Sequence, residues 1–404
     1  MLLILAWRNI WRNKKRSLII IAAIAAGLLS GLFASAVMFG MGESLINSTI
    51  DRDLGHIQIH STDFEDEKLL ADTIPNFQSA LNSIITQKDI SGYSSRVVIE
   101  GMGSSATTST GLRIVGINPL NEKNVTTIHK RIVVGNYFSE KKKNQILIGK
   151  KLADDLGIRE KSKIVLSFQD FDGNIIYGAF RVSGIFETES SVFDKMNVFL
   201  EENILFSLLK TKPVYHEVAI RLGSAQQVDS VYSMLNAELP GLSVKSWKDL
   251  APELKLMDEM IGLQLNIFLG VILFALLFGI TNTMLMSVIE RVREFGVLMA
   301  IGMKRRRVFT MIIVETILLS LVGGFIGMIL AFITIAWVGD VGIDLSAFTE
   351  GFTAWSLSPM LHPVLPISFY VSITLMIIIT AIFSAVYPAI KAIKLKPAQA
   401  IRTY

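Results

Sequence analysis

Charged residues suited to chemistry gather in one short stretch, 290–307, which lies between two long apolar stretches of this 404-residue chain. An apolar stripe of Phe295, Leu298 and Met299 recurs at helical spacing, so the stretch predicts a short helix. In order, it holds Glu290, Arg291, Arg293, Glu294, Phe295, Gly296, Ala300, Gly302 and the basic residues Lys304, Arg305, Arg306 and Arg307. Gly302 and the basic run end the predicted helix. A compact charged helix of this kind is suited to binding another protein.

Two polar residues interrupt the apolar stretches on either side. Asn282 precedes the charged stretch and Glu315 follows it. Polar groups are costly inside a membrane and usually pair within a helix bundle. Two interpretations stay open: a polar contact that changes between conformations, and a static bond between helices or a side chain that reaches the membrane surface.

Sequence motifs for catalysis are absent. The chain contains no GxxxxGK[ST] phosphate-binding loop, no HExxH, no GxSxG and no cysteine. His56 and His60 are four residues apart, which suits a metal only on a helix, and residues 57–60 alternate like a strand. Positions four apart on a strand stand about 13 Å from each other, at roughly 3.3 Å per residue. We therefore expect no enzyme active site, no metal and no cofactor bound by this chain.

The elements that position these residues are four apolar stretches. The chain is 51% apolar and 18% charged, whereas soluble proteins are about 25% charged. A membrane-spanning helix needs about 20 apolar residues, and residues 17–40, 262–288, 308–338 and 366–387 qualify. Residues 41–255 form a predicted extracytoplasmic domain, and 339–365 a short loop on the same side. The run Ala34-Ser35-Ala36 also resembles a signal-peptide cleavage site, but the apolar run before it is longer than is usual for such signals.

Basic residues mark the predicted cytoplasmic side. They precede the first span within segment 1–16, occupy the loop 289–307 and follow the fourth span in the tail 388–404. All three clusters agree with one topology, in which both termini lie inside. Because no basic face stands out on the domain, we expect no nucleic-acid partner.

Small residues recur every fourth position in two spans. Span one carries Ala23, Gly27, Gly31 and Ser35, and span three carries Gly323 and Gly327, followed by Ala331. Such stripes let helices approach closely in lipid, although small residues are also common in membrane helices in general. In segment 1–16, Leu3, Trp7, Ile10 and Trp11 recur at helical spacing and predict an amphipathic helix at the cytoplasmic interface.

The domain 41–255 mixes strand and helix patterns and predicts an α+β fold. Short runs rich in β-branched and aromatic residues predict strands at 97–99, 113–116, 146–148, 164–168 and 180–185. Helical patterns cover 77–86, 150–156 and 226–239, and residues 171–174 predict a hairpin turn.

Four motifs together resemble the FtsX/MacB-like family of ABC transporter permeases (type VII, mechanotransmission). The loop resembles the family signature ER-x-REFG-x-L-x-A-x-G, and residues 8–16 resemble its RN-x-x-RNK-x-R segment. Residues 146–153 match ILIGKKLA, and residues 388–402 resemble the closing P-A-x-x-A-x-x-x-x-P-A-x-A-L-R. Residues 160–163 depart from the family, whose members usually show Gly-Asp there. Within the family, a bare four-span chain is most similar to the lipoprotein-releasing permeases LolC and LolE.

The resemblance implies a MacB-like periplasmic core domain, a multi-pass location in a bacterial inner membrane, and ATP and Mg²⁺ used by a separate ATPase dimer. It implies a second permease subunit, in a homo- or heterodimer, and contact with membrane lipids. The ATPase-coupling residues would be Glu290, Arg291, Arg293, Glu294, Phe295, Gly296, Ala300 and Gly302, with Arg291 and Glu294 contacting the ATPase and Phe295 filling its groove. Release of lipoproteins for outer-membrane sorting is the first expectation. The alternatives are MacB-like tripartite efflux of drugs, toxins or peptides, and an FtsX-like transducer that activates a cell-wall hydrolase.

Overall fold

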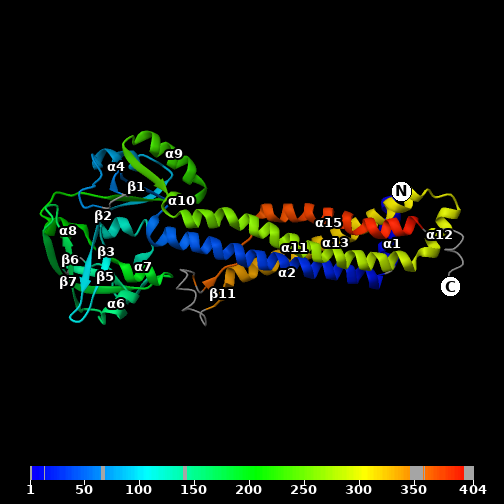
Figure 1. Ribbon diagram of the computed structural model, residues 1–404, viewed down its shortest axis with the longest axis horizontal. Coiled ribbons are helices and arrows are strands. Elements are labelled where there is room, and N and C mark those ends of the chain that lie inside the picture. The colour runs from blue at the N-terminus through cyan, green and yellow to red at the C-terminus, as the bar shows by residue number, and fades with distance from the viewer. Residues whose placement is uncertain are drawn as a thin grey trace. The chain divides into compact units, whose positions relative to one another are not determined.

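The chain forms two compact units in a computed structural model that describes residues 2–12, 14–64, 69–139, 143–345, 358 and 360–394. The helical unit is drawn from residues 1–42, 258–344 and 360–404, and the α+β domain from residues 43–257 and 345–359. Residues 395–404, with Lys396, Arg402 and most of the closing motif, lie outside the described residues, as does most of the loop 346–359. Most of the elements are labelled in Figure 1.

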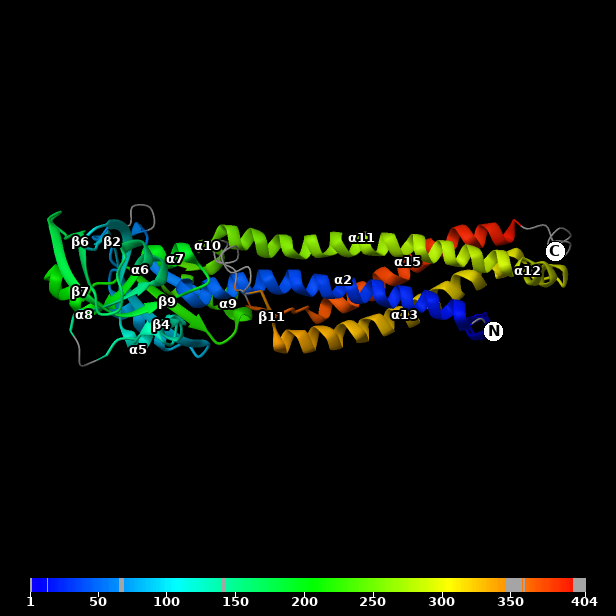
Figure 2. The same ribbon diagram turned by 90° about the horizontal axis from the view of Figure 1, so that it is seen from below.

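Among the residues that the structure describes, four helices are long and apolar enough to cross a membrane, which confirms the predicted set of spans. They are α2 (Lys14–Thr49), α11 (Pro252–Glu290), α13 (Arg305–Val341) and α15 (Ile367–Ile393). Figures 1 and 2 show them side by side. Three of the four helices extend beyond both ends of the predicted span, and α15 extends past its end alone, because apolarity marks membrane depth whereas polar helix formers continue the same helix. Their shared core includes Leu28, Leu32, Leu269, Leu319 and Ile373.

The described part of the helical unit also contains two short helices and a two-stranded ribbon. Helix α1 (Leu2–Arg12) buries Ala6 and Ile10, while Trp7 and Trp11 stay exposed. It is tied to α2 by Ser17, whose hydroxyl donates to the Ile10 carbonyl over 2.6 Å. Helix α12 (Val292–Ala300) joins α11 to α13, and strands β11 (Ile343–Asp344) and β12 (Met360–Leu361) form a small ribbon.

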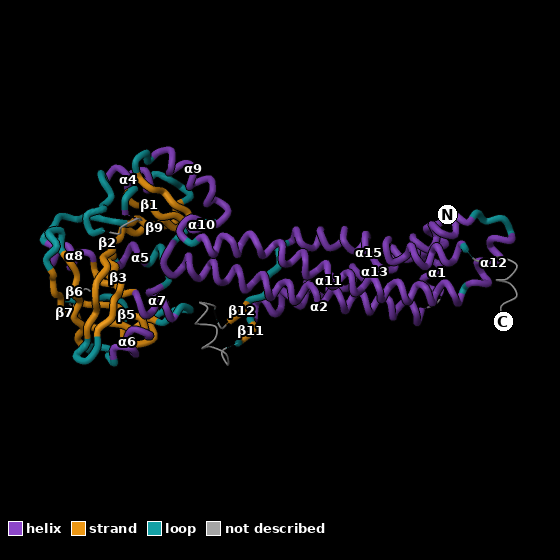
Figure 3. Tube along the Cα trace, viewed as in Figure 1, coloured by secondary structure: helices purple, strands orange, loops and turns teal. Residues whose placement is uncertain are grey.

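In the described part of the α+β domain, ten strands form one mixed sheet, shown in Figure 3, which confirms the predicted α+β class. The strands are β1 (Ile57–Ser61), β2 (Ile90–Ser104), β3 (Ser109–Ile117), β4 (Ile132–Gly135), β5 (Gln145–Gly149), β6 (Lys163–Gln169), β7 (Ile175–Phe186), β8 (Asn197–Glu201), β9 (Glu217–Leu222) and β10 (Leu242–Ser246). The helices are α4 (Phe77–Ile85), α5 (Pro119–Glu122), α6 (Lys150–Leu156), α7 (Ser191–Met196), α8 (Glu202–Leu209), α9 (Val228–Glu238) and α10 (Trp247–Leu250). Short turns are η1 (Ile50–Leu54), η2 (Ile128–Lys130) and η3 (Ala225–Gln227).

The sheet has two parts that share strand β2. On one side the order is β10-β1-β9-β2, all antiparallel, with a core of Ile57, Ile59 and Val218 beneath α4 and α9. On the other side of β2, neighbouring strands pair in the order β2-β3-β8-β5-β7-β6. Strand β6 also pairs with β2, so these six strands close a ring. The pairs β3–β8 and β5–β7 are parallel, and the rest of the ring is antiparallel.

Two turns in the ring follow from local sequence. Between β6 and β7, Asp170 Oδ1 accepts the amides of Asp172 and Asn174, and Gly173 adopts a φ of 82°, as the predicted hairpin turn requires. Before β6, Lys161 takes a left-handed φ of 68°, at the place where the sequence departs from the family's Gly-Asp. Glycine adopts that conformation without steric cost, so the departure places mild backbone strain at this turn.

Candidate functional site

The first candidate site is the connection from α11 through α12 to α13. Helix α12 ends in a Schellman arrangement, in which the Met303 amide donates to the Leu298 carbonyl and the Gly302 amide to the Met299 carbonyl. Gly302 has a φ of 102°, which a residue with a Cβ rarely adopts. The connection is therefore a defined turn that fixes α12 against the start of α13.

Arg291 forms the centre of this site and is only 6% exposed. Its Nη1 donates to both carboxylate oxygens of Glu315 on α13, each at 3.1 Å, and its Nε donates to Glu294 over 3.0 Å. The guanidinium also lies 5.2 Å above the Phe295 ring. A buried charge needs such partners because an unpaired one is costly. The ion pair therefore joins the α12 turn to the interior of α13.

Glu294 extends the network to the N-terminal helix. Its carboxylate also pairs with Arg12 at the end of α1, and it remains about half exposed. Partial burial opposes ionisation of Glu294, but hydrogen bonds from Arg12 and Arg291 outweigh it and hold the pKa of that carboxyl below its usual range. Four charged side chains thus link α1, α12 and α13 in one chain of contacts.

Two of the residues expected to contact an ATPase, Arg291 and Phe295, have their side chains buried inside the helical unit. Phe295 is 1% exposed and packs in the core of the helical unit, and Arg291 is buried against Glu315 and Phe295. Because the buried ion pair and the ring contact use both side chains inside the bundle, neither presents a surface to a partner in this structure. Gly296 is also buried, whereas Glu290, Arg293, Glu294, Ala300 and Gly302 are exposed. The large apolar residues exposed here are Val297 and Ile301, the latter at 80%, and the sequence analysis did not select them.

The small residues of α2 and α13 lie mostly at contacts between helices of this chain. A Cβ on Gly31 would lie 2.7 Å from Ile272 of α11, and one on Gly27 would lie 3.0 Å from Leu276. On α13, a Cβ on Gly323 would meet Ile24 at 3.0 Å and one on Gly327 would meet Ala25 at 2.9 Å. Ser35 is buried and Ala23 is exposed. Helix α2 therefore packs closely against both α11 and α13.

The two polar residues within the spans are not brought together. Glu315 is 1% exposed and pairs with Arg291, whereas Asn282 lies on the exposed side of α11. Glu315 thus bonds the α12 turn to α13, and this contact is compatible with both interpretations left open by the sequence.

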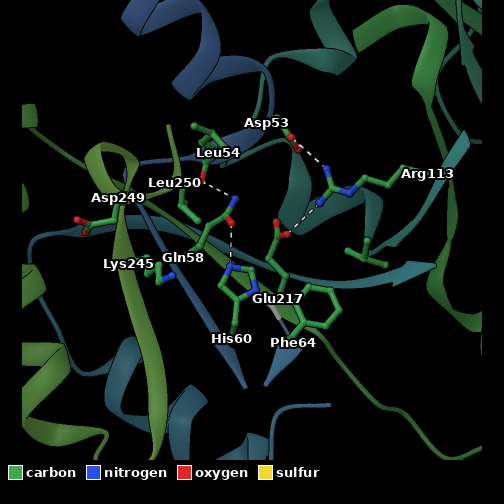
Figure 4. Close-up of a pocket in the computed structure, with 11 residues that line it drawn as sticks. Asp53, Leu54, Gln58, His60, Phe64, Arg113, Glu217, Lys245, Asp249 and Leu250 are labelled. Carbon is green, nitrogen blue, oxygen red and sulfur yellow. Dashed lines mark hydrogen bonds and ion pairs between the residues drawn. The ribbon is translucent and has the colours of Figure 1, made fainter. Parts of the chain in front are cut away.

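A second candidate site is a pocket of about 360 Å³ in the α+β domain, drawn in Figure 4. Gln58 and His60 of β1, Phe64, Arg113 of β3 and Glu217 of β9 line it, together with Asp53, Leu54, Val98, Lys245, Asp249 and Leu250. Arg113 donates to Asp53 and to Glu217, each over 3.0 Å. The pocket lies where η1 meets the sheet.

His60 faces this pocket with a fixed hydrogen-bonding pattern. Gln58 Nε2 donates to the Leu54 carbonyl over 3.0 Å, so Gln58 Oε1 accepts from His60 Nε2 over 2.9 Å. His60 Nδ1 is then an acceptor, buried and without a hydrogen-bond partner among the described residues. Burial lowers the pKa of His60, although the Glu217 carboxylate opposes this. His56 has a separate role, since its Nδ1 accepts the Leu222 amide.

The sequence analysis missed the charged residues of this second site. Arg113 and Glu217 lie on strands far apart in the sequence, and no motif connects them. The available signal was the alternation of the polar residues Gln58 and His60 with the apolar residues Ile57 and Ile59 along one strand.

Comparisons with known proteins cover almost the whole chain. The profile of the MacB-like periplasmic core domain matches residues 17–238, and that of the FtsX-like permease C-terminal region matches residues 266–397. The uncharacterized ABC transporter permease YknZ of Bacillus subtilis (strain 168) is 23% identical over 419 residues, with 98% of each chain covered. The crystal structure of the extracellular domain of YknZ from Gram-positive bacteria, 15% identical, covers 47% of this chain and 99% of that one at a TM-score of 0.34.

Another relative matches over a shorter stretch. The macrolide export ATP-binding/permease protein MacB of Chlorobium luteolum is 36% identical over 124 residues, which are 31% of this chain and 16% of that protein. The chain thus spans less than a fifth of the length of that relative. The core-domain profile alone covers more than half of the chain, and with the four apolar helices it decides the assignment. The chain belongs to the MacB/FtsX-like family of ABC transporter permeases, with a MacB-like periplasmic core domain and an FtsX-like C-terminal region.

Proposed function

We propose that this permease works by mechanotransmission, with ATP hydrolysed by separate subunits that bind at the α12 turn. The observation that carries the proposal is the network Arg12–Glu294–Arg291–Glu315, because it ties the turn to α1 and α13 through buried or bridging charges. A displacement of α12 would then move these helices with it. The full-length relative is named a permease, which supports a division of labour with an ATPase.

The surface for that ATPase would be the exposed side of α12 and the residues after it. Val297, Ile301 and the side chains of Arg293 and Glu294 present apolar and charged groups together, a combination typical of protein interfaces. The remaining coupling residues Glu290, Ala300 and Gly302 lie at the same exposed turn. Arg291, Phe295 and Gly296 would act from inside, by holding the turn in shape.

For the cargo, we propose lipoproteins extracted from the inner membrane, on the similarity of the four-span organisation to that of the lipoprotein-releasing permeases. Export of macrolides is the second candidate, because MacB relatives carry that name. Both candidates imply a second permease subunit and a cytoplasmic location of both chain ends. An FtsX-like transducer that activates a hydrolase would move no cargo at all.

The test uses the full chain, purified with the ATPase subunits that accompany it and reconstituted in vesicles. Val297→Asp places a charge on the proposed ATPase surface, and Val133→Asp places the same charge on a similarly exposed valine of β4. We expect V297D to lose ATP-driven release and V133D to retain it. Release is measured separately for a lipoprotein and for a macrolide.

The outcomes separate the candidates. Release of the lipoprotein alone supports the first cargo, release of the macrolide alone supports the second, and ATP hydrolysis without either favours the transducer. Normal release by V297D would exclude the α12 surface as the place where the ATPase binds.

A further inference from the structure

The pocket drawn in Figure 4 lies wholly within the α+β domain and takes no part in the proposed transport mechanism. Every residue that lines it falls within residues 43–257, and its volume is about 360 Å³. Pockets that bind small molecules in proteins measure roughly 300–1,000 Å³. The pocket therefore has room for a small organic ligand.

One side of the pocket carries a hydrogen-bond acceptor without a partner. His60 is 3% exposed, and its Nε2 donates to Gln58, so that Nδ1 is left as an acceptor. Among the described residues, no group donates to this nitrogen. Buried polar atoms in native proteins are nearly always hydrogen-bonded, and an exception requires an explanation such as a bound water, ion or ligand. His60 therefore offers a place for a donor that the described residues do not supply.

Apolar side chains accompany His60 around the pocket. Phe64 stacks on its ring, with the ring centroids 5.5 Å apart and an interplanar angle of 8°. The aliphatic lining residues are Leu54, Val98 and Leu250. Leu54 is the last residue of the π-helical turn η1 and directly follows its charged triplet, residues 51–53. Because ligand pockets pair an apolar wall with a few polar groups, the ligand should combine a donor with a small apolar body.

The charged groups around the pocket carry an excess of negative charge. The lining carboxylates are Asp53, Glu217 and Asp249, and the lining cations are Arg113 and Lys245. Arg113 is already engaged by two of the carboxylates, since it donates to Asp53 and to Glu217 over 3.0 Å each. Behind them, Arg96 pairs with Glu122 over 2.7 Å, so these two residues add no net charge. The pocket therefore favours a cation over an anion.

An ammonium group suits these features better than a metal ion. Among the residues that the structure describes, no three His, Cys, Asp or Glu side chains gather as a metal site requires. An ammonium nitrogen carries one positive charge together with N–H donors. Burial lowers the pKa of His60, so at neutral pH the ring is uncharged and Nδ1 can accept one of these donors. The Glu217 carboxylate lies within electrostatic reach of the same ring and favours a cation there.

We propose that this pocket binds a small organic ammonium ion. One of its N–H groups donates to His60 Nδ1, and its apolar body lies against Phe64 and Val98. The proposal depends neither on the cargo nor on ATP-driven movement, because every group that it uses belongs to one domain.

The test titrates the full chain, purified in a neutral detergent, with three compounds that share one apolar body. Phenethylamine is a cation with N–H donors, phenethyltrimethylammonium is a cation without a donor, and phenethyl alcohol is a donor without charge. Isothermal titration calorimetry measures each affinity at neutral pH, and titration into detergent alone gives the background. We expect phenethylamine to bind at one site and both other compounds to bind at least about 10-fold more weakly, because each lacks a charge-assisted hydrogen bond.

Two variants connect the binding to this pocket. His60→Phe keeps a ring against Phe64 but removes Nδ1, and it should weaken phenethylamine binding by at least about 10-fold. Asp249→Asn removes one lining charge, whereas its amide oxygen can still accept from Ser246, and it should weaken binding by about 3-fold. The matched control is Asp172→Asn, an exposed position of the same domain outside the pocket, which should leave the affinity unchanged.

Three results would overturn the proposal. Absence of saturable phenethylamine binding leaves a bound water as the partner of Nδ1. Equal affinities for the three compounds exclude both the donor and the charge as the basis of recognition. Unchanged affinity in a folded H60F, checked by thermal unfolding, places the binding elsewhere. If H60F does not fold, the comparison of the three compounds on the unsubstituted chain and the effect of D249N against D172N decide.

Discussion

The ion pair between Arg291 and Glu315 shows how a single residue can serve a function from inside the protein. Both side chains are nearly inaccessible, and their geometry places one guanidinium nitrogen between two carboxylate oxygens. Burying two charges carries a large desolvation cost that their attraction roughly offsets. The pair therefore contributes less to stability than to fixing the α12 turn in one position relative to α13.

Because the desolvation cost and the attraction nearly cancel, removing one partner of the Arg291–Glu315 pair should destabilise the protein more than removing both. Glu315→Leu leaves Arg291 buried without its main partner and should lower the free energy of unfolding by about 3–5 kcal/mol. Arg291→Met combined with Glu315→Leu replaces both charges and should recover most of that loss. Unfolding in detergent with a denaturant measures both variants.

The double variant also separates stability from coupling. It should fold well yet show weakened ATP-driven release, because the link from the turn to α13 is gone. If E315L proves as stable as the double variant, the buried pair is not the interaction that we describe.

At the residue scale, the sequence identified Glu315 as a polar residue within a span but did not identify its partner. Arg291 precedes it by 24 positions and reaches it only because the α12 turn reverses the chain. The family signature directed attention to a surface role for Arg291 and Phe295. A motif records which residues are present, whereas the direction of each side chain depends on packing that no spacing shows.

At the scale of elements, the helical unit depends on backbone contacts that only glycine permits. Gly327 of α13 lies against Ala25 of α2, where an added Cβ would be 2.9 Å from both the Cα and the carbonyl oxygen of Ala25. Backbone atoms of two long helices cannot yield locally. Gly270 of α11 is the natural comparison, since a Cβ there would meet no atom within 4 Å.

We predict that Gly327→Ala lowers the free energy of unfolding by about 1–3 kcal/mol through overpacking. Gly270→Ala should leave it unchanged or raise it by up to about 1 kcal/mol, because alanine favours the helix. Thermal unfolding of the two variants in the same detergent gives the comparison. If the two variants change the free energy of unfolding equally, the close approach of α2 and α13 does not contribute to stability.

Elements were predicted well where a pattern is local and poorly where it is not. The strands within β2, β3, β5, β6 and β7 and the helices α4, α6 and α9 each carry their own periodicity, and the structure has them close to the predicted places. The closed ring of strands was not predicted, because the pairing of β3 with β8 and of β5 with β7 joins distant segments. The π-helical turn was also missed, since its charged triplet has no helical or strand period.

At the scale of the whole molecule, the central question is which side of the membrane each unit faces. Basic residues flank the ends of α2, α11 and α13 that lie near α12, and cytoplasmic loops carry an excess of such residues. The proposed ATPase can bind only if the α12 turn is in the cytoplasm. The same topology requires the α+β domain to face the opposite compartment.

The absence of cysteine from the chain makes this topology directly measurable. Ile301→Cys, at a position 80% exposed beside α12, should react with a membrane-impermeant maleimide only after the cells are permeabilised. Tyr177→Cys, 69% exposed on β7, should react once the outer compartment is accessible and the inner membrane is still intact. Ile24→Cys, 2% exposed within the bundle, is the control that should react in neither state. Labelling of I301C in cells with an intact inner membrane would place the α12 turn outside, where ATP-hydrolysing subunits cannot reach it, and mechanotransmission through this chain would then have no source of force.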